Sequence, residues 1–301
     1  MGNLAGIANS KVIGKNYSNR VVLYLESTED LEVLQERWFR GWGEWIQFES
    51  VSMSVGGGGG GGAQVCQKVG TARQNRSCAF GIVDRDTLLN GRVAGNPRWE
   101  AFFETDHAAF DAARHLGEYV KVLRRWEMEN YLLHPEAIRE LIEDSVHPRS
   151  PCSPNATAQY LLDLSEEAIV LTAANLVLIA QGANSLSHQF GIQFSAVAHL
   201  LAAVLTHAQN TGSTVSVQDI QGQCSKIRNF LRDDTEDSEG QWNQLNHLID
   251  GKIFLTRFCK RCGLKDPQQL RLARRIAELG LIDPEIQEFM EELRREAKLL
   301  A

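Results

Sequence analysis

Two short apolar runs predict the core of the fold. They cover residues 21–25 and 79–83, and neither alternates with polar positions. Uninterrupted apolar runs of this length are typical of strands buried on both faces, as in parallel sheets. Residues 45–51 alternate apolar and polar positions, which indicates an edge or half-buried strand, and residues 119–123 are a further strand candidate.

Helical patterns separate these strands. Apolar residues fall at helical spacing over about residues 29–40, where Ser27 or Thr28 is expected to be the N-cap, and further helices are expected over 63–75 and around 107–117. The resulting strand–helix–strand order predicts an α/β fold with a Rossmann-like, mainly parallel sheet and right-handed crossovers.

Carboxylates follow two of the expected strands. The first run is followed by Glu26, and the second by Asp84 and Asp86. An open α/β sheet carries its chemistry at the carboxyl ends of its strands, and on an extended chain positions i and i+2 point the same way. Converging carboxylates repel each other unless a hard cation such as Mg²⁺ lies between them. The alternative is that Asp84 caps a turn and Asp86 is solvated, which is common for Asp.

Two more acids follow the strand candidate at 119–123. Glu127 and Glu129 would be delivered by that strand to the same sheet edge. The alternative is ordinary surface charge at the start of a helix.

These motifs together resemble the Toprim domain of topoisomerases, bacterial primases and OLD-type nucleases. The segment 25–30 has Ser27 where many members have Gly, and 82–86 ends in the Asp-x-Asp pattern. Residues 125–135, with Trp126 and the run Glu-Asn-Tyr-Leu-Leu, are similar to the Toprim nucleases that accompany ATPases in phage defence. Within this OLD-like superfamily the chain most resembles the nuclease effectors of PARIS, the phage anti-restriction-induced system.

The resemblance implies a metal-dependent phosphodiesterase with Mg²⁺ or Mn²⁺ as its cofactor. The metal ligands that it implies are Glu26, Asp30, Asp84, Asp86 and Glu129, with Glu127 a weaker candidate. The implied catalytic residues are Glu26, Asp84, Asp86 and Lys252. Lys252, in Asp-Gly-Lys, is similar in setting to the lysine that OLD-type nucleases bring into their site, although an exposed Lys after a turn is an equal alternative.

Net charge, motifs and cysteine content limit the partners and cofactors that the chain is expected to use. The chain has 301 residues and a net charge of −7, which is evidence against binding a long nucleic-acid duplex unaided. It carries no convincing Walker A sequence, so ATP would be hydrolysed by another protein. Six cysteines without a secretory signal pattern favour reduced thiols in the cytoplasm, and Cys259 and Cys262 are expected to be core thiols rather than zinc ligands. The histidines also lack the spacing of a zinc helix.

A Pro- and Ser-rich stretch at 147–154 predicts a domain boundary. Residues 1–150 are expected to form the Toprim catalytic domain. Residues 151–301 are expected to form a helical domain for partner binding and dimerisation.

The seven glycines from Gly56 to Gly62 predict a mobile loop near the active edge, since they lack the Gly-Lys-Ser/Thr ending of a phosphate-binding loop. The acidic run at 233–239 is expected to be a solvated loop.

Three classes of function follow. The first is an anti-phage endoribonuclease effector. The PARIS resemblance implies that it cleaves host tRNA, that an ABC-type sensor ATPase restrains it until a phage trigger protein acts, and that it forms a homodimer after release. The second is an OLD-type DNA nuclease or nickase inside an ATPase complex. The third is a non-catalytic Toprim adaptor, which has no need to keep mutually repelling acids.

Overall fold

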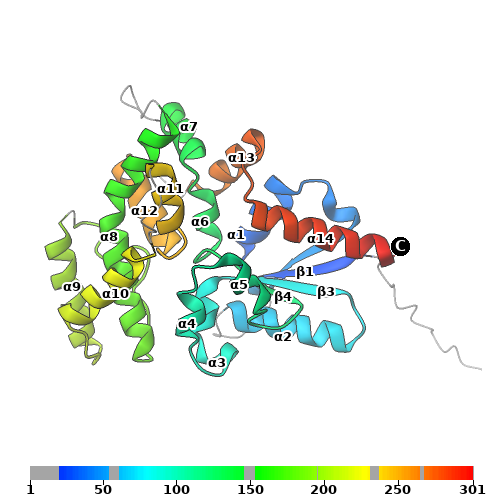
Figure 1. The fold of residues 1–301 in the computed structure, drawn as a ribbon, viewed down its shortest axis with the longest axis horizontal. Helices are drawn as coiled ribbons and strands as arrows, with labels where there is room; N and C mark the ends of the chain where they lie inside the picture. The colour runs from blue at the N-terminus through cyan, green and yellow to red at the C-terminus, as the bar shows by residue number, and fades with distance from the viewer. Residues whose placement is uncertain are drawn as a thin grey trace, which may run out of the picture.

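A four-stranded parallel sheet lies at the centre of the first half of the chain (Figure 1). The structure, a computed structural model, describes residues 20–53, 61–145, 153–194, 196–230, 237–264 and 268–300. The strand order is β2-β1-β3-β4, and every neighbouring pair is parallel. The strands are β1 (Val21–Leu25), β2 (Ile46–Ser50), β3 (Ala79–Val83) and β4 (Val120–Val122). The mainly parallel α/β fold expected from the apolar runs is confirmed.

Burial differs between the two apolar strands. All five residues of β3 are buried, as an uninterrupted apolar run predicts. In β1 only alternate positions are buried, so Val22 and Tyr24 lie on a less completely covered face. β2 alternates in the same way at the edge of the sheet, as its sequence pattern predicts.

Mostly short helices connect the strands, and two more follow β4. They are α1 (Thr28–Leu31), the π-helix η1 (Glu32–Trp38), the 3₁₀ helices η2 (Trp42–Glu44), η3 (Val51–Met53) and η4 (Arg85–Leu89), and α2 (Gly61–Gln74), α3 (Gly91–Ala94), α4 (Trp99–Phe102), α5 (His107–Ala112), α6 (Met128–Leu132) and α7 (Pro135–Ser145).

Two helix expectations were wrong in detail. The helix expected over residues 29–40 is a single α-turn that continues as the π-helix η1. The helix expected around 107–117 ends at Ala112, because Arg114 and Gly117 adopt positive φ angles of 41° and 96° that no α-helix accommodates.

The second half is helical where the structure describes it. Its helices are α8 (Pro154–Ala180), α9 (Val197–Asn210), α10 (Val217–Arg228), α11 (Ser238–Leu245), α12 (Gly251–Arg261), α13 (Gln269–Leu279) and α14 (Pro284–Leu300). The long helix α8 packs against α7, α10, α11 and α12. None of the helices in these described segments combines the length and the apolar character needed to cross a membrane.

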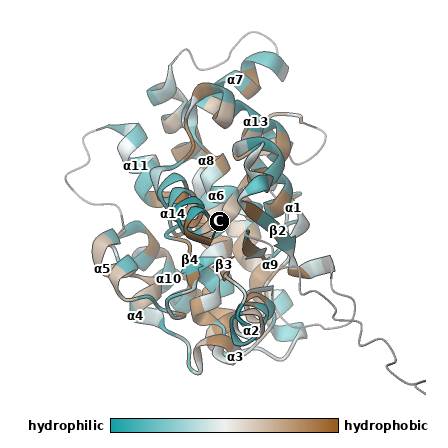
Figure 2. Ribbon diagram, turned by 90° about the vertical axis from the view of Figure 1, so that its right-hand side faces the viewer, coloured by the Kyte–Doolittle hydropathy of each residue, from teal (hydrophilic) through white to brown (hydrophobic). Residues whose placement is uncertain are grey.

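The last two helices return to the first half of the chain. α13 packs against η1, and α14 packs against β1 and β2 beside the sheet (Figure 1). Both helices carry hydrophilic as well as hydrophobic residues, as amphipathic helices do (Figure 2). The Trp38 indole donates to the Ala273 carbonyl at 3.0 Å, and Tyr131 donates to Glu285. One hydrophobic core cluster therefore contains residues of both halves. The division near residue 150 stays a prediction, and most of the stretch that suggested it lies outside the described residues.

The described cysteines are free thiols. Cys259 is buried and Cys262 is half-buried, and burial raises the pKa of the Cys259 thiol to about 11. Tyr160 lies 3.7 Å from the Cys262 sulfur. This agrees with the expectation that the pair is part of the core.

Candidate functional site: a carboxylate cluster with one lysine

Glu26 lies directly after β1 and is held by the end of the neighbouring strand. Its Oε1 accepts a hydrogen bond from the Asp84 backbone N–H at 2.9 Å and another from the Thr87 hydroxyl at 3.2 Å. β1 and β3 are parallel neighbours, so their carboxyl ends meet at one edge. The structure thus brings Glu26 and Asp84 together at that edge.

Asp84 and Asp86 reach this edge by a different route from the expected one. The strand ends at Val83, and residues 85–89 form the 3₁₀ helix η4, so the two acids are not alternate positions of an extended chain. Asp84 occupies the N-cap position of η4, but its side chain makes no capping hydrogen bond. The alternative in which Asp84 serves as a turn cap is therefore wrong. Asp86 interacts electrostatically with Glu26, Asp84 and Glu127, so it belongs to the cluster.

Asp30 joins the cluster while also capping α1. Ser27 is the N-cap, and its hydroxyl accepts from the Asp30 N–H at 3.0 Å while Asp30 Oδ2 accepts from the Ser27 N–H at 3.0 Å. This reciprocal arrangement is a capping box. It occupies one carboxylate oxygen of Asp30, and the same carboxylate interacts with Glu26, Glu127 and Lys252.

Glu127 and Lys252 form the tightest pair in the site. Glu127 Oε1 accepts from the Lys252 backbone N–H at 2.6 Å, and Oε2 lies 3.0 Å from Lys252 Nζ. Glu127 is 5 % exposed, whereas the Lys252 side chain is 45 % exposed. The lysine is therefore an ion-paired member of the site rather than an isolated surface residue. Glu127, the weaker candidate in the sequence, is the residue that holds it.

Glu129 lies beside this pair with one oxygen unsatisfied. Its Oε1 accepts from Gln269 Nε2 at 2.9 Å. Its Oε2 lies 3.5 Å from Lys252 Nζ, is buried, and accepts no hydrogen bond from the described residues. A buried oxygen without a hydrogen bond is costly, which is why such atoms commonly mark a ligand or ion position.

Asp250 is a member of the cluster that the sequence alone did not single out as a site residue. It caps α12 by accepting from the Ile253 N–H at 2.9 Å, and its own N–H donates to Thr172 at 2.9 Å. Its carboxyl also interacts electrostatically with Glu127. Its position two residues before Lys252 could have predicted this, because Asp is a common N-cap. A helix that begins next to Lys252 brings its N-cap residue to the same site.

Gly251 allows α12 to approach α6 closely. A Cβ at this position would lie 2.7 Å from Asn130 Oδ1 and 3.0 Å from the Asn130 backbone nitrogen. Asn130 in turn donates to the carbonyls of Asn246 and Ile249, each at 2.9 Å. Glycine between Asp250 and Lys252 is thus what places both charged groups against Glu127.

The end of the glycine run also reaches the cluster. Gly61 and Gly62 begin α2, whereas residues 56–60 lie outside the described residues. A Cβ on Gly61 would lie 2.6 Å from Glu26 Oε2, and one on Gly62 would lie 2.3 Å from Thr87 Oγ1. These two glycines are ordered helical residues packed on Glu26, and the expectation of a mobile loop is wrong for them.

Seven carboxyl groups face one cation in this site. The acids among the described residues are Glu26, Asp30, Asp84, Asp86, Glu127, Glu129 and Asp250. The cation is Lys252, which forms ion pairs with Glu127 and Glu129 and acts on Asp30, Asp84, Asp86 and Asp250 through longer-range electrostatics. Burial and then repulsion by Asp86 and Asp30 raise the pKa of Glu26 to about 8. Burial, followed by repulsion from Glu127, raises the pKa of Asp86 to about 6 and that of Glu129 to about 8.

The same causes act on the remaining groups. The pKa values of Asp84 and Asp250 are raised well above their ordinary range, first by burial and then by neighbouring carboxylates. Burial opposes the charged form of Lys252, but the attraction of Glu127, Glu129 and Asp84 is stronger and raises its pKa. The cluster therefore lacks positive charge, so it holds protons near neutral pH.

The donor set fits a hard divalent cation. Carboxylate oxygens are the ligands that Mg²⁺ and Mn²⁺ prefer, and Glu129 Oε2 is a buried oxygen without a hydrogen bond. Among the residues that the structure describes, no three Asp, Glu, His or Cys side chains are already arranged around one metal position. Binding would therefore require carboxylates to turn toward the ion.

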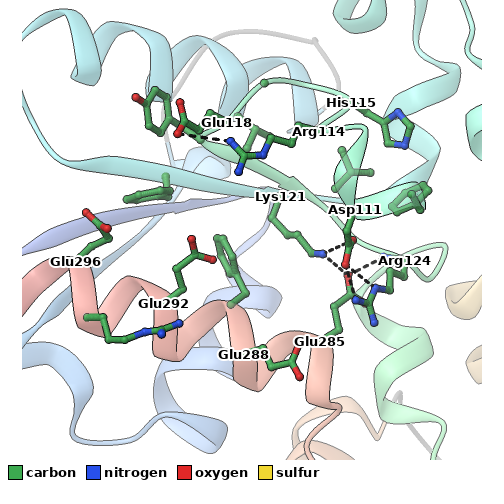
Figure 3. A pocket seen from close by; sticks show the side chains of 18 of the residues that line it. Asp111, Arg114, His115, Glu118, Lys121, Arg124, Glu285, Glu288, Glu292 and Glu296 are labelled. Atoms are coloured by element: carbon green, nitrogen blue, oxygen red, sulfur yellow. Dashed lines mark hydrogen bonds and ion pairs between the residues drawn. The ribbon is translucent and has the colours of Figure 1, made fainter. Parts of the chain in front are cut away.

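A separate cavity lies between the sheet and α14, away from these acids (Figure 3). It measures about 670 Å³ and contains side chains of both signs. Lys121 lies 2.7 Å from Asp111 and 3.1 Å from Glu285, and Arg124 also binds Asp111. Because these charges neutralise one another, we place the candidate active site at the carboxylate cluster.

Comparison with known families, proteins and structures identifies no relative of this chain. The chain matches no family model, no curated protein and no solved structure. The class that fold and site define is an α/β protein with an acid cluster at the carboxyl edge of a parallel sheet.

Proposed function

We propose that this protein is a divalent-metal-dependent nuclease of the Toprim type. The observation that carries the proposal is the convergence of seven carboxyl groups and one lysine at the carboxyl ends of parallel strands. A purely structural cluster would not be expected to collect so much buried like charge, because each additional carboxylate raises the cost of ionising the others. The same cost argues against a non-catalytic adaptor.

The residues have separable roles in phosphodiester cleavage. Glu26, Asp30, Asp84, Asp86 and Glu129 would hold Mg²⁺ or Mn²⁺. When bound, the cation supplies Lewis-acid polarisation of the phosphodiester and charge stabilisation. Lys252, whose Nζ is fixed by Glu127 and whose side chain is 45 % exposed, is placed to bind a phosphate oxygen. Glu26 is the alternative proton acceptor: while no cation is bound to it, its pKa is about 8, so it can accept or return a proton near neutral pH.

The substrate and partner follow from the resemblance of the sequence to PARIS effectors. On this basis we propose cytoplasmic tRNA as the substrate and an ABC-type sensor ATPase as the restraint, with release and homodimerisation after a phage trigger. The net charge of −7 supports a compact RNA over a long duplex. Cleavage of DNA within an ATPase complex is the competing outcome.

The test compares RNA and DNA integrity in cells that produce the protein. Wild-type chain freed of its ATPase should fragment tRNA and leave chromosomal DNA intact. Glu26→Gln should reduce the cleavage by at least about a hundredfold, the usual scale for losing a general acid–base group. A matched exposed change, Glu288→Gln on α14, should cleave as the wild type does.

Two results would contradict the proposal. Unchanged cleavage by purified Glu26→Gln, or by wild type in excess chelator, would remove the carboxylate cluster from the chemistry. Fragmented chromosomal DNA with intact tRNA would instead favour the OLD-type alternative.

A further inference from the structure

A groove rich in arginine lies between η1 and α13. It is a hollow of about 640 Å³, and its charged lining is Arg37, Arg40, Arg271 and Arg274 against Glu36 and Glu278. Four positive and two negative groups give a local charge of +2, which contrasts with the −7 of the whole chain. Positive surface concentrated in a groove of an acidic protein is typical of a binding track for an anion.

The acids of the groove are already paired. Glu278 accepts from Arg274 at 2.7 Å, and Glu36 lies 3.7 Å from Arg37. Arg40 is exposed and has no ion-pair partner among the described residues. Arg274 is 72 % exposed in its side chain, so most of its donors remain open to a ligand.

Both walls of the groove begin at the carboxylate cluster. η1 starts directly after the helical turn that contains Asp30. α13 starts at Gln269, whose side chain donates to Glu129 Oε1 at 2.9 Å. η1 and α13 pack against each other, so each wall of the groove has one end at the candidate active site.

The dimensions suit a nucleic-acid backbone. At about 1.5 Å per residue, Arg274 lies about 7.5 Å further along α13 than Gln269. A strand advances about 3.4 Å per nucleotide in a helix, so this rise along α13 corresponds to about two nucleotides. Arginine presents planar, bidentate donors that match phosphate oxygens, and every basic group lining this groove is arginine.

We propose that the groove formed by Arg37, Arg40, Arg271 and Arg274 binds the phosphate backbone of the nucleic-acid strand whose scissile bond lies at the carboxylate cluster. This proposal rests on the proposed nuclease function and deepens it, because it assigns the surface that offsets the acidity of the chain.

The test is binding of a fluorescein-labelled 20-nucleotide RNA of mixed sequence to the full chain, measured by anisotropy in EDTA so that cleavage is absent. Arg40→Gln with Arg274→Gln should weaken binding about tenfold at moderate salt. It should also reduce the slope of log affinity against log salt by about 1.4, since each single-strand phosphate contact contributes about 0.7.

Two matched controls use the same chain. Arg40→Lys with Arg274→Lys keeps both charges, so it should keep the salt slope and lose only the part of the affinity that bidentate contacts contribute. Lys68→Gln with Lys298→Gln removes two exposed charges outside the groove and should keep both the affinity and the salt slope. Thermal unfolding of each variant checks that the fold is intact.

The outcomes separate the groove from the nuclease. Metal-dependent RNA cleavage with unchanged binding by the Arg40/Arg274 double variant would overturn the groove and leave the nuclease standing. RNA binding that depends on the groove, without cleavage in the presence of any divalent cation, would overturn the nuclease and leave the RNA-binding groove standing. A third outcome is that the wild type binds labelled poly-glutamate and not RNA, with the poly-glutamate binding lost in the Arg40/Arg274 double variant. That result would overturn the nucleic-acid assignment in favour of an acidic protein partner.

Discussion

At the scale of single residues, Glu26 combines good hydrogen bonding with an unfavourable charge environment. Its Oε1 accepts from Asp84 and Thr87, which favours the ionised form, but burial and the neighbouring Asp86 have the larger effect and raise its pKa. The folded protein therefore holds a proton on this group at pH values where the unfolded chain has lost it. A bound divalent cation would replace that proton.

This balance predicts how stability depends on pH. The pKa of Glu26 rises from an ordinary 4.5 to about 8, so between these values the folded state binds more protons than the unfolded state. The associated stability is fully present below pH 4.5 and is lost as the pH rises through 8. In chelator, the wild-type Tm should be lower at pH 8.5 than at pH 5.5. Each kcal/mol lost from the free energy of unfolding should lower the Tm by about 2–4 °C.

The variant Glu26→Gln isolates this contribution. The amide is neutral at both pH values and its oxygen can still accept from Asp84, so the fall in Tm should be smaller. Calorimetry on both proteins checks this. An equal fall in the two proteins would mean that Glu26 is ionised in the folded state at pH 7.

At the scale of elements, the position of the site depends on two helix starts that contain glycine. α2 starts with Gly61 and Gly62 against Glu26 and Thr87, and α12 starts with Gly251 against Asn130. Each glycine removes a Cβ that would push the helix away from the carboxylates. The two helices therefore enclose the cluster from opposite halves of the sequence.

A pair of alanine substitutions in α2 tests this role. Gly62→Ala places a Cβ 2.3 Å from Thr87 Oγ1 and 3.1 Å from Glu26 Oε1, so we expect a loss of about 1–3 kcal/mol in the free energy of unfolding and reduced cleavage. Gly70→Ala in the same helix meets nothing within 4 Å. It should stabilise the protein by about 0.5–1 kcal/mol and leave cleavage unchanged.

Denaturant unfolding and cleavage assays on both variants give the result. If Gly62→Ala is as stable and active as Gly70→Ala, the close packing of α2 on Glu26 is not a requirement of the site.

The sequence predicted these elements unevenly. The apolar runs predicted β1 and β3, alternation predicted β2, and the further candidate at 119–123 is β4. The rule that parallel strands end at one edge of the sheet correctly placed Glu26 beside Asp84. The reason offered for Asp86 was wrong, because alternation along a strand does not apply inside the 3₁₀ helix η4. The contact between Glu127 and Lys252 spans 125 residues, and periodicity carries no information at that distance.

At the scale of the whole molecule, the second half completes the site and stabilises the first. α12 supplies Asp250 and Lys252, and α13 supplies Gln269 to Glu129. α14 supplies Glu285, whose carboxylate accepts from Tyr131 and from the Arg124 N–H at 3.0 Å. The helical half therefore contributes to the candidate site, and its role in partner binding stays a prediction.

Residues 1–150 alone should therefore fold poorly. Separated from α12, α13 and α14, they lose the side chains that pair with Glu127, Glu129 and Tyr131, and apolar sheet surface becomes exposed. We expect no cooperative thermal transition by circular dichroism for this fragment and no cleavage. A fragment that melts cooperatively within a few degrees of the full chain would show that the sheet domain is independent.

The central claim is that the carboxylate cluster binds a divalent cation, and Mn²⁺ titration at pH 7 tests it most directly. We predict that the wild type binds Mn²⁺, followed by electron paramagnetic resonance, with release of protons into a weakly buffered solution, because Glu26 and Glu129 are protonated before the ion enters. Asp84→Asn should bind at least about tenfold more weakly. Equal Mn²⁺ binding by the two proteins, or binding by neither, would contradict the account.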